Sequence, residues 1–173
     1  MRPASQLAVE TQFAARRPRV PSAAAVRRWA EAAHRAALGR PARGSSPARG
    51  ASARLCVRIV GPAASRRLNR EFRGKDAPTN VLSFPSSPEE RRHAASLGDL
   101  VVCARVVAVE ARAQGKPWLA HWAHMVVHGV LHLHGYDHEA RRDALEMERL
   151  EVEILGRFGY QDPYQPREPA NHG

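Results

Sequence analysis

The sequence has few of the features that mark secreted or membrane-embedded proteins. Its 173 residues include only two cysteines, Cys56 and Cys103, and two isolated cysteines form no metal-site spacing. Because each lies in an apolar run, we expect both to be small core residues in a reducing compartment. No apolar run approaches the length of about 18 residues that a transmembrane helix needs, and no apolar core follows the start as in a secretory signal. The expected protein is cytoplasmic and has no membrane partner.

Lysine and aromatic residues are also scarce. Only two of the 27 basic residues are lysine, so the basic charge is carried by arginine, whose planar guanidinium binds phosphate in a bidentate way. A compositional bias of the genome explains this preference equally well. Aromatic residues make up 6% of the chain, which leaves no evident platform for stacking bases.

The charge that is present is unevenly distributed. The net charge is +10, yet residues 1–75 carry 17 basic and 3 acidic side chains, whereas residues 76–173 carry 10 and 14. The first part therefore has a charge of +14 and the second a charge of −4. Only the first part suits a polyanionic partner.

The length fits a single domain over residues 1–173, with a flexible basic loop at 40–53 and a polar, mobile tail at 161–173. Hydrophobic periodicity predicts four strands, at 6–11, 55–60, 79–84 and 99–103. It predicts helices at 22–39, capped by Ser22, and at 63–73, 104–114, 117–134 and 139–158. Leu68 and Phe72 should point inward, Leu145 should belong to the apolar face of its helix, and residues 85–97 should form a polar loop. Mixed strands and helices indicate an α+β or α/β class with a small sheet.

Six of the nine histidines fall between residues 121 and 138. His128 and His132 are four residues apart on a predicted helix, so their imidazoles share one face. Gly135 can end that helix in a left-handed conformation, which lets the chain bring His138 back as a third ligand. The spacing therefore predicts a three-histidine metal site, with zinc as the favoured ion. Three protein ligands leave a fourth position for water, as in catalytic zinc sites.

The neighbouring histidines have other expected places. His124 shares the face of His128, but it lies too far from His132 along the helix axis to bind the same ion, so we place it and His121 behind the site or in a cleft. His134 should face away. The histidine spacing equals that of an extended zinc-protease signature, but Gly129 stands where that signature has its catalytic glutamate. Asp137 and Glu139 are the nearby carboxylates.

Three segments together resemble a known family. Residues 128–138 read HGVLHLHGYDH, residues 68–85 read LNREFRGKDAPTNVLSFP, and residues 98–100 read GDL. They closely resemble the hallmark blocks of the YbeY family, which comprises bacterial and organellar rRNA maturation factors regarded as single-strand-specific zinc endoribonucleases. The similarity spans roughly residues 5–164. His134, at a usually aliphatic position, and the long loop at 40–53 depart from the family pattern.

The resemblance implies a single α+β domain with a small, mostly parallel, four-stranded sheet surrounded by helices and a zinc site at the end of a helix. It implies one zinc ion per chain held by His128, His132 and His138, and a functional arginine that maps onto Arg73. The implied substrate is single-stranded RNA, specifically rRNA in 16S rRNA 3′ end processing and ribosome quality control. The implied partners are the small ribosomal subunit and its assembly factors.

The leading hypothesis is therefore a zinc-dependent endoribonuclease in which zinc activates water for attack on a phosphodiester. Arg73 would hold the phosphate, and Asp137 or zinc-bound hydroxide would serve as the base. Arginines of the helix at 63–73 would bind RNA phosphates, namely Arg66, Arg67, Arg70 and Arg73. Two alternatives remain open: a metallopeptidase-like hydrolase, and a non-enzymatic ribosome assembly factor whose zinc is structural.

Overall fold

The computed structural model of the chain describes residues 6–42 and 52–166. The strands are β1 (Leu7–Phe13), β2 (Ala53–Val60), β3 (Val81–Pro85) and β4 (Ser96–Cys103). The helices are α1 (Ala23–Gly39), α2 (Pro62–Arg73), α3 (Pro88–His93), α4 (Ala104–Ala113), α5 (Trp118–Leu133) and α6 (Arg141–Gly156).

The four strands form one sheet in the order β1-β2-β4-β3. β1, β2 and β4 run parallel, whereas β3 pairs antiparallel with β4 at the edge of the sheet, with Val81 opposite Val102 and Pro85 opposite Gly98. The parallel strands need crossover connections, which helices supply. The expected α+β fold with a small, mostly parallel, four-stranded sheet is confirmed.

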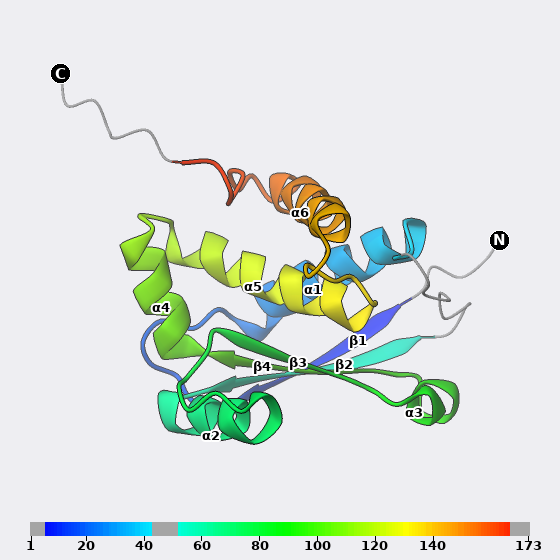
Figure 1. The fold of residues 1–173 in the computed structure, drawn as a ribbon, viewed down its shortest axis with the longest axis horizontal. Helices are drawn as coiled ribbons and strands as arrows, with labels where there is room; N and C mark the ends of the chain where they lie inside the picture. The colour runs from blue at the N-terminus through cyan, green and yellow to red at the C-terminus, as the bar shows by residue number, and fades with distance from the viewer. Residues whose placement is uncertain (1–5, 43–51, 167–173) are drawn as a thin grey trace.

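Helices cover the two faces of the sheet unequally. α1, α5 and α6 lie on one face, and α2 lies on the other (Figure 1). The main core is on the first face, where side chains such as Leu55, Val57 and Leu100 are buried beneath α1 and α5. A smaller cluster on the second face joins Val60, Leu82 and Val101 to the apolar side of α2. Alternate residues of each strand point to opposite faces, which explains why neighbours such as Leu100 and Val101 serve different layers.

Local sequence signals account for most helix boundaries. The Ser22 side chain accepts a hydrogen bond from the backbone N–H of Ala25 at 3.2 Å, so the expected cap of α1 is present. Pro117, expected in the first turn of α5, stands one residue earlier, at the N-cap. α6 begins at Arg141 rather than at 139, because the turn that follows α5 uses the intervening residues.

The expectation of a polar loop over residues 85–97 is wrong. This stretch contains the short helix α3 and the first two residues of β4. Ser87 and Glu90 form a capping box: the Ser87 hydroxyl accepts from the Glu90 N–H at 3.2 Å, and the Glu90 carboxylate accepts from the Ser87 N–H at 2.7 Å. Pro88 in the first turn adds a preset backbone angle. These local signals form a helix without any buried residue.

Two apolar residues are more exposed than predicted. Leu68 packs against the second-face cluster. Phe72, in the last turn of α2, is 59% exposed and meets the Phe84 ring in a T-shaped arrangement, with ring centroids 5.1 Å apart. Leu145 of α6 is also exposed. Hydrophobic periodicity predicts towards which side of a helix a side chain points. How exposed that side chain is depends on whether another element covers that turn of the helix.

Parts of the predicted loop at 40–53 and tail at 161–173 lie outside the described residues. The beginning of the tail packs on the protein, since the Tyr164 hydroxyl donates to the buried Glu151 carboxylate of α6. Within residues 6–42 and 52–166, no helix combines the length and the apolar character needed to cross a membrane.

Candidate metal centre

Most of the histidines between residues 121 and 138 lie on α5, a helix that packs against β3 and β4 and is covered on its other side by α6 (Figure 1). α5 ends just before Gly135, whose φ of 90° is left-handed, a conformation that glycine adopts at little cost. The N–H of Tyr136 then donates to the Leu131 carbonyl at 3.1 Å, which reverses the chain. Asp137 Oδ1 accepts from the N–H of His138 at 2.7 Å and fixes the turn that carries this histidine. As predicted, α5 ends next to this glycine, and the following turn brings the side chain of His138 back towards the histidines of the helix.

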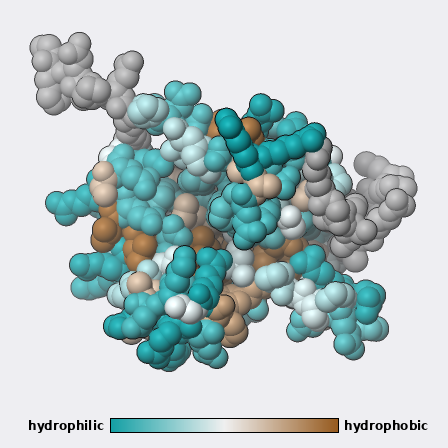
Figure 2. Space-filling model, in the orientation of Figure 1, coloured by the Kyte–Doolittle hydropathy of each residue, from teal (hydrophilic) through white to brown (hydrophobic). Residues whose placement is uncertain are grey.

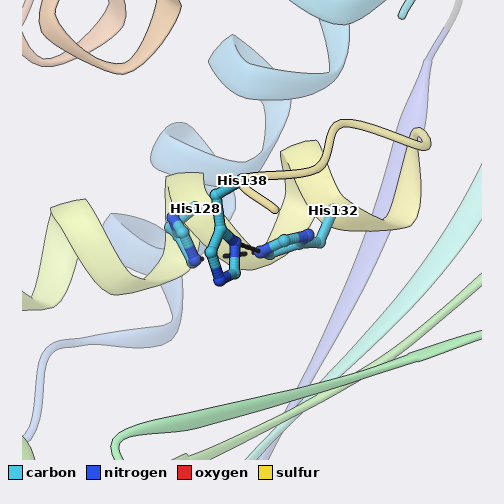
Figure 3. A group of neighbouring side chains, drawn as sticks. All are labelled: His128, His132 and His138. Atoms are coloured by element: carbon cyan, nitrogen blue, oxygen red, sulfur yellow. Dashed lines mark hydrogen bonds between the residues drawn. The ribbon is translucent and has the colours of Figure 1, made fainter. Parts of the chain in front are cut away.

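The three predicted ligands converge on one point (Figure 3). His132 Nε2 lies 3.0 Å from His128 Nε2 and 3.1 Å from His138 Nδ1. One ring nitrogen of each histidine lies within 4.8 Å of the other two. Two of the residues come from adjacent turns of α5 and the third from the following turn.

This arrangement fits a tetrahedral metal ion. Imidazole nitrogens bound about 2.0–2.1 Å from a tetrahedral ion lie about 3.3 Å apart, close to the separations observed here. A neutral imidazole has one ring N–H and one ring nitrogen with a lone pair. When three ring nitrogens converge, hydrogen bonds between them cannot pair every lone pair with a proton, so some lone pairs face one another. A cation removes that conflict. An all-imidazole donor set suits zinc and several other transition metals.

The environment keeps the middle ligand neutral. Burial, together with repulsion from the neighbouring His128 and His138, lowers the pKa of His132 to about 4. A neutral imidazole is the form that binds metal, because a protonated ring has no lone pair to donate. The side chain of His128 is 24% exposed, so the site remains open to solvent.

A buried carboxylate stands behind this cluster. Glu151 of α6 is fully buried, and its Oε1 accepts a hydrogen bond from His128 Nδ1 at 2.6 Å. Its Oε2 accepts from His124 Nε2 at 2.9 Å and from the Tyr164 hydroxyl. Burial alone would raise the pKa of the Glu151 carboxyl, but the hydrogen bonds from His124 and His128 lower it to about 2. Glu151 is therefore an ionised acceptor.

Our sequence interpretation missed Glu151. The signal was present, because the residue falls between Leu150 and Ile154 on the buried stripe of an amphipathic helix. An acidic residue in such a stripe is unusual and is generally paired when it is buried. What the sequence does not reveal is which buried groups it faces, since α5 and α6 meet only in the folded protein.

His124, His128 and Glu151 also satisfy a geometric test for metal ligands. Glu151 accepts hydrogen bonds from His128 Nδ1 at 2.6 Å and from His124 Nε2 at 2.9 Å, so these two ring nitrogens carry protons and have no lone pair for an ion. We therefore assign this group to a hydrogen-bonded support behind the three-histidine cluster. His124 accordingly lies behind the site, as its position along the helix predicted.

The remaining histidines of the cluster lie elsewhere in the interior. His121 bonds to Glu110 of α4 at 2.7 Å. His134 turns away, as expected, and its Nε2 lies 2.9 Å from His34 Nδ1 of α1. The six histidines between residues 121 and 138 thus form three separate groups, of which one has converging lone pairs.

Gly129 separates this site from a zinc protease. A Cβ added at Gly129 would lie 2.8 Å from a terminal methyl of Leu100, so this position faces β4 at close range. The catalytic glutamate of the protease signature would have to occupy that space. The backbone of α5 approaches the sheet there because the residue is glycine, which disfavours the metallopeptidase alternative.

The predicted RNA-binding arginines lie on α2, on the other face of the sheet (Figure 1), and Figure 2 shows hydrophilic side chains gathered over this helix. Arg66 pairs with Asp76 through two bonds of 2.8 Å, and Arg70 lies 3.9 Å from the same carboxylate. The side chains of Arg67 and Arg73 make no hydrogen bond or ion pair to any described residue. None of these four arginines contacts the histidines among the residues that the structure describes. β3 separates the two regions, with Leu82 facing α2 and the Ser83 hydroxyl donating to the Gly129 carbonyl.

A family model and two relatives that are similar to this chain carry the same description. The family model described as Endoribonuclease YbeY matches residues 22–159. Endoribonuclease YbeY of Alkalilimnicola ehrlichii is 52% identical over 165 residues, which cover 94% of this chain and 93% of that protein. Endoribonuclease YbeY of Aromatoleum aromaticum is 48% identical over 163 residues, covering 92% and 94% respectively. The solution structure of TM1509 from Thermotoga maritima has a TM-score of 0.55 at 22% identity and covers 92% of this chain and 99% of that one, which supports the fold.

Proposed function

The chain belongs to the Endoribonuclease YbeY family, and from this premise we propose that it is a zinc-dependent endoribonuclease that cleaves single-stranded RNA during rRNA maturation. The observation that carries the proposal is the convergence of three imidazole nitrogens at about 3 Å spacing. In this proposal His128, His132 and His138 hold one zinc ion. The same proposal includes processing of the 16S rRNA 3′ end, ribosome quality control, and contact with the small ribosomal subunit and its assembly factors. The proposed location of the reaction is the cytoplasm.

The bound zinc ion would activate a water molecule for attack on a phosphodiester and would stabilise negative charge on the phosphoryl oxygens. The residues of the chain have separate tasks around it. His132 stays neutral because of its burial and its neighbours, so it keeps its lone pair at neutral pH. Asp137 is the proposed general base. It holds the turn of His138 through Oδ1 and lies at the exposed side of the cluster.

Arg73 is the proposed phosphate-holding residue. Its guanidinium has no partner among the described residues, so phosphate binding would not require breaking an existing ion pair. The Arg67 guanidinium likewise has no ion pair among the described residues, whereas Arg66 and Arg70 both pair with the carboxylate of Asp76. A single strand that contacts both α2 and the histidines must pass the edge strand β3. We propose that the four arginines bind phosphates on one side of that edge while the metal centre acts on the other.

The test removes two ligands at once. A His128→Ala, His132→Ala double variant should lose its bound zinc and its cleavage of single-stranded RNA, because one histidine cannot hold the ion. His93→Ala, at an exposed histidine of α3, is the matched control and should keep both properties. Undiminished cleavage by a zinc-free double variant would refute catalytic zinc. Normal rRNA processing in cells that carry a folded ligand variant would instead support the assembly-factor alternative.

A further inference from the structure

Glu151 is buried where it can control one ligand of the metal centre. It lies on α6, whereas the histidines it touches lie on α5, so the contact exists only after the two helices pack. Its two oxygens receive hydrogen bonds from three side chains, of which only His128 belongs to the converging cluster. A fully buried ionised carboxylate is costly unless such bonds compensate it.

The geometry fixes the proton positions. A carboxylate accepts hydrogen bonds, so the His128 Nδ1 that lies 2.6 Å from Oε1 must carry the ring proton. The Nε2 of His128, which faces His132 at 3.0 Å, is then left with its lone pair. By the same reasoning His124 is protonated at Nε2, whereas its Nδ1 is buried without a partner. The hydrogen bonds also hold the His128 ring at a fixed angle.

We propose that Glu151 is a positioning residue, which holds His128 in the Nδ1–H tautomer and aims its Nε2 at the metal, with His124 and Tyr164 saturating the second carboxylate oxygen. This proposal rests on the proposed function only in that a metal ion binds the three histidines. A carboxylate behind a ligating histidine orients the ring and raises its basicity, and losing such a partner typically weakens metal binding about 10- to 100-fold. Tyr164 extends this support to the segment after α6.

Another carboxylate–histidine pair supplies a matched control. Glu110 of α4 accepts from His121 Nε2 at 2.7 Å, and His121 lies on the same helix as His128. His121 is not one of the three converging histidines. Glu151→Gln and Glu110→Gln therefore each remove the charge of a carboxylate that accepts from a histidine of α5, one facing the metal ligands and one not.

The first experiment measures zinc affinity of the full chain by competition with a chromophoric chelator. Glu151→Gln should weaken zinc binding about 10- to 100-fold, whereas Glu110→Gln should leave it within about twofold of the wild type. Tyr164→Phe, which keeps the ring and removes only the hydroxyl, should weaken it by a smaller factor of about 2 to 10. Equal zinc affinity in the wild type and in a folded Glu151→Gln variant would overturn the proposal, as would an equal loss in Glu110→Gln.

The second experiment needs neither a variant nor a metal. Long-range proton–nitrogen NMR correlations of the metal-free wild-type protein report which ring nitrogen of His128 is protonated. We expect Nδ1–H, and a predominant Nε2–H tautomer would overturn the proposal even if Glu151→Gln did not fold. Because this readout is independent of zinc and RNA, the proposed nuclease function can fail while the assignment of Glu151 stands, and the reverse is equally detectable.

Discussion

The histidines at and near α5 and the arginines of α2 are two groups of nitrogen-bearing side chains that differ in burial and in bonding partners. Five of the six histidines between residues 121 and 138 are buried or half-buried, and most of these five bond to a side chain outside the group, such as Glu151, Glu110 or His34. The arginines are exposed, and two of them bond to nothing described. Burial forces polar groups to find partners within the protein, whereas water serves exposed groups equally well. The buried region is therefore built for one fixed geometry, and the exposed region is available for an external polyanion.

Metal removal should separate the two regions most sharply. Dialysis against a strong chelator should abolish cleavage of single-stranded RNA, since the proposed chemistry depends on the ion. RNA binding, measured by fluorescence anisotropy, should change by less than about twofold, because phosphate contacts supply most of the affinity. Zinc added back should restore cleavage. Cleavage that survives metal removal would show that the histidine region is not the catalytic one.

Overpacking beneath α5 should damage the buried region. Gly129→Leu should reduce the free energy of unfolding by about 3 kcal/mol, because its side chain would collide with the buried Leu100. Urea unfolding followed by circular dichroism measures this loss. The matched control is Gly39→Ala in the last turn of α1, where nothing lies within 4 Å of the added Cβ. This control should change stability by less than about 1 kcal/mol. A stable Gly129→Leu variant would show that α5 can move off the sheet.

Acidification should destabilise the buried region through His134. Burial, with repulsion from His34 and Arg91, lowers the pKa of His134 to about 4. The unfolded chain takes up this proton near pH 6.5 and the folded chain only near pH 4, so stability falls as the pH drops through that window. In His134→Leu the pH dependence of the unfolding free energy should shrink by about 2 kcal/mol across the window. His93→Leu should leave it unchanged, and an unchanged slope in His134→Leu would contradict the burial argument.

Charge reversal on α2 should lower RNA binding or cleavage and should leave the zinc content and the fold intact. Arg73→Glu should weaken binding and should reduce the slope of log affinity against log salt by about 1, because one phosphate contact is lost. Zinc content and unfolding midpoint should stay at wild-type values, since the exposed side chain of Arg73 makes no hydrogen bond or ion pair to a described residue. Arg28→Glu, on an exposed position of α1, controls for the change of net charge. Equal effects of both substitutions would mean that Arg73 belongs to an ordinary solvated face.

The smallest effect is expected at Asp76. Asp76→Asn removes the carboxylate that Arg66 and Arg70 share, which frees both guanidinium groups for phosphates. RNA affinity should rise slightly and its salt dependence should steepen, whereas the unfolding midpoint should hardly move, because exposed ion pairs add little stability. Weaker RNA binding would indicate that the pair positions the arginines.

The sequence predicted the convergence of the three histidines better than their surroundings, and the reason is local. His128, His132, Gly135 and His138 are joined by one helix and one turn, so helical geometry suffices to bring them together. The missed helix α3 was also encoded locally, by the capping box of Ser87 and Glu90. Phe72 was assigned to the interior because periodicity alone does not tell whether a helix turn is covered.

Spacing, composition and motifs by themselves determined the family, the four strands, the described helices other than α3, and the three converging histidines. Each of these depends on neighbours within about a dozen residues or on similarity to known chains. Only the tertiary structure decided that Glu151 stands behind His128, that Gly129 faces Leu100 and that the arginines lie across the sheet from the histidines. Each of these relations joins elements far apart in the chain. The packing of the apolar faces of these elements determines which residues meet, and no local sequence pattern encodes the resulting contacts.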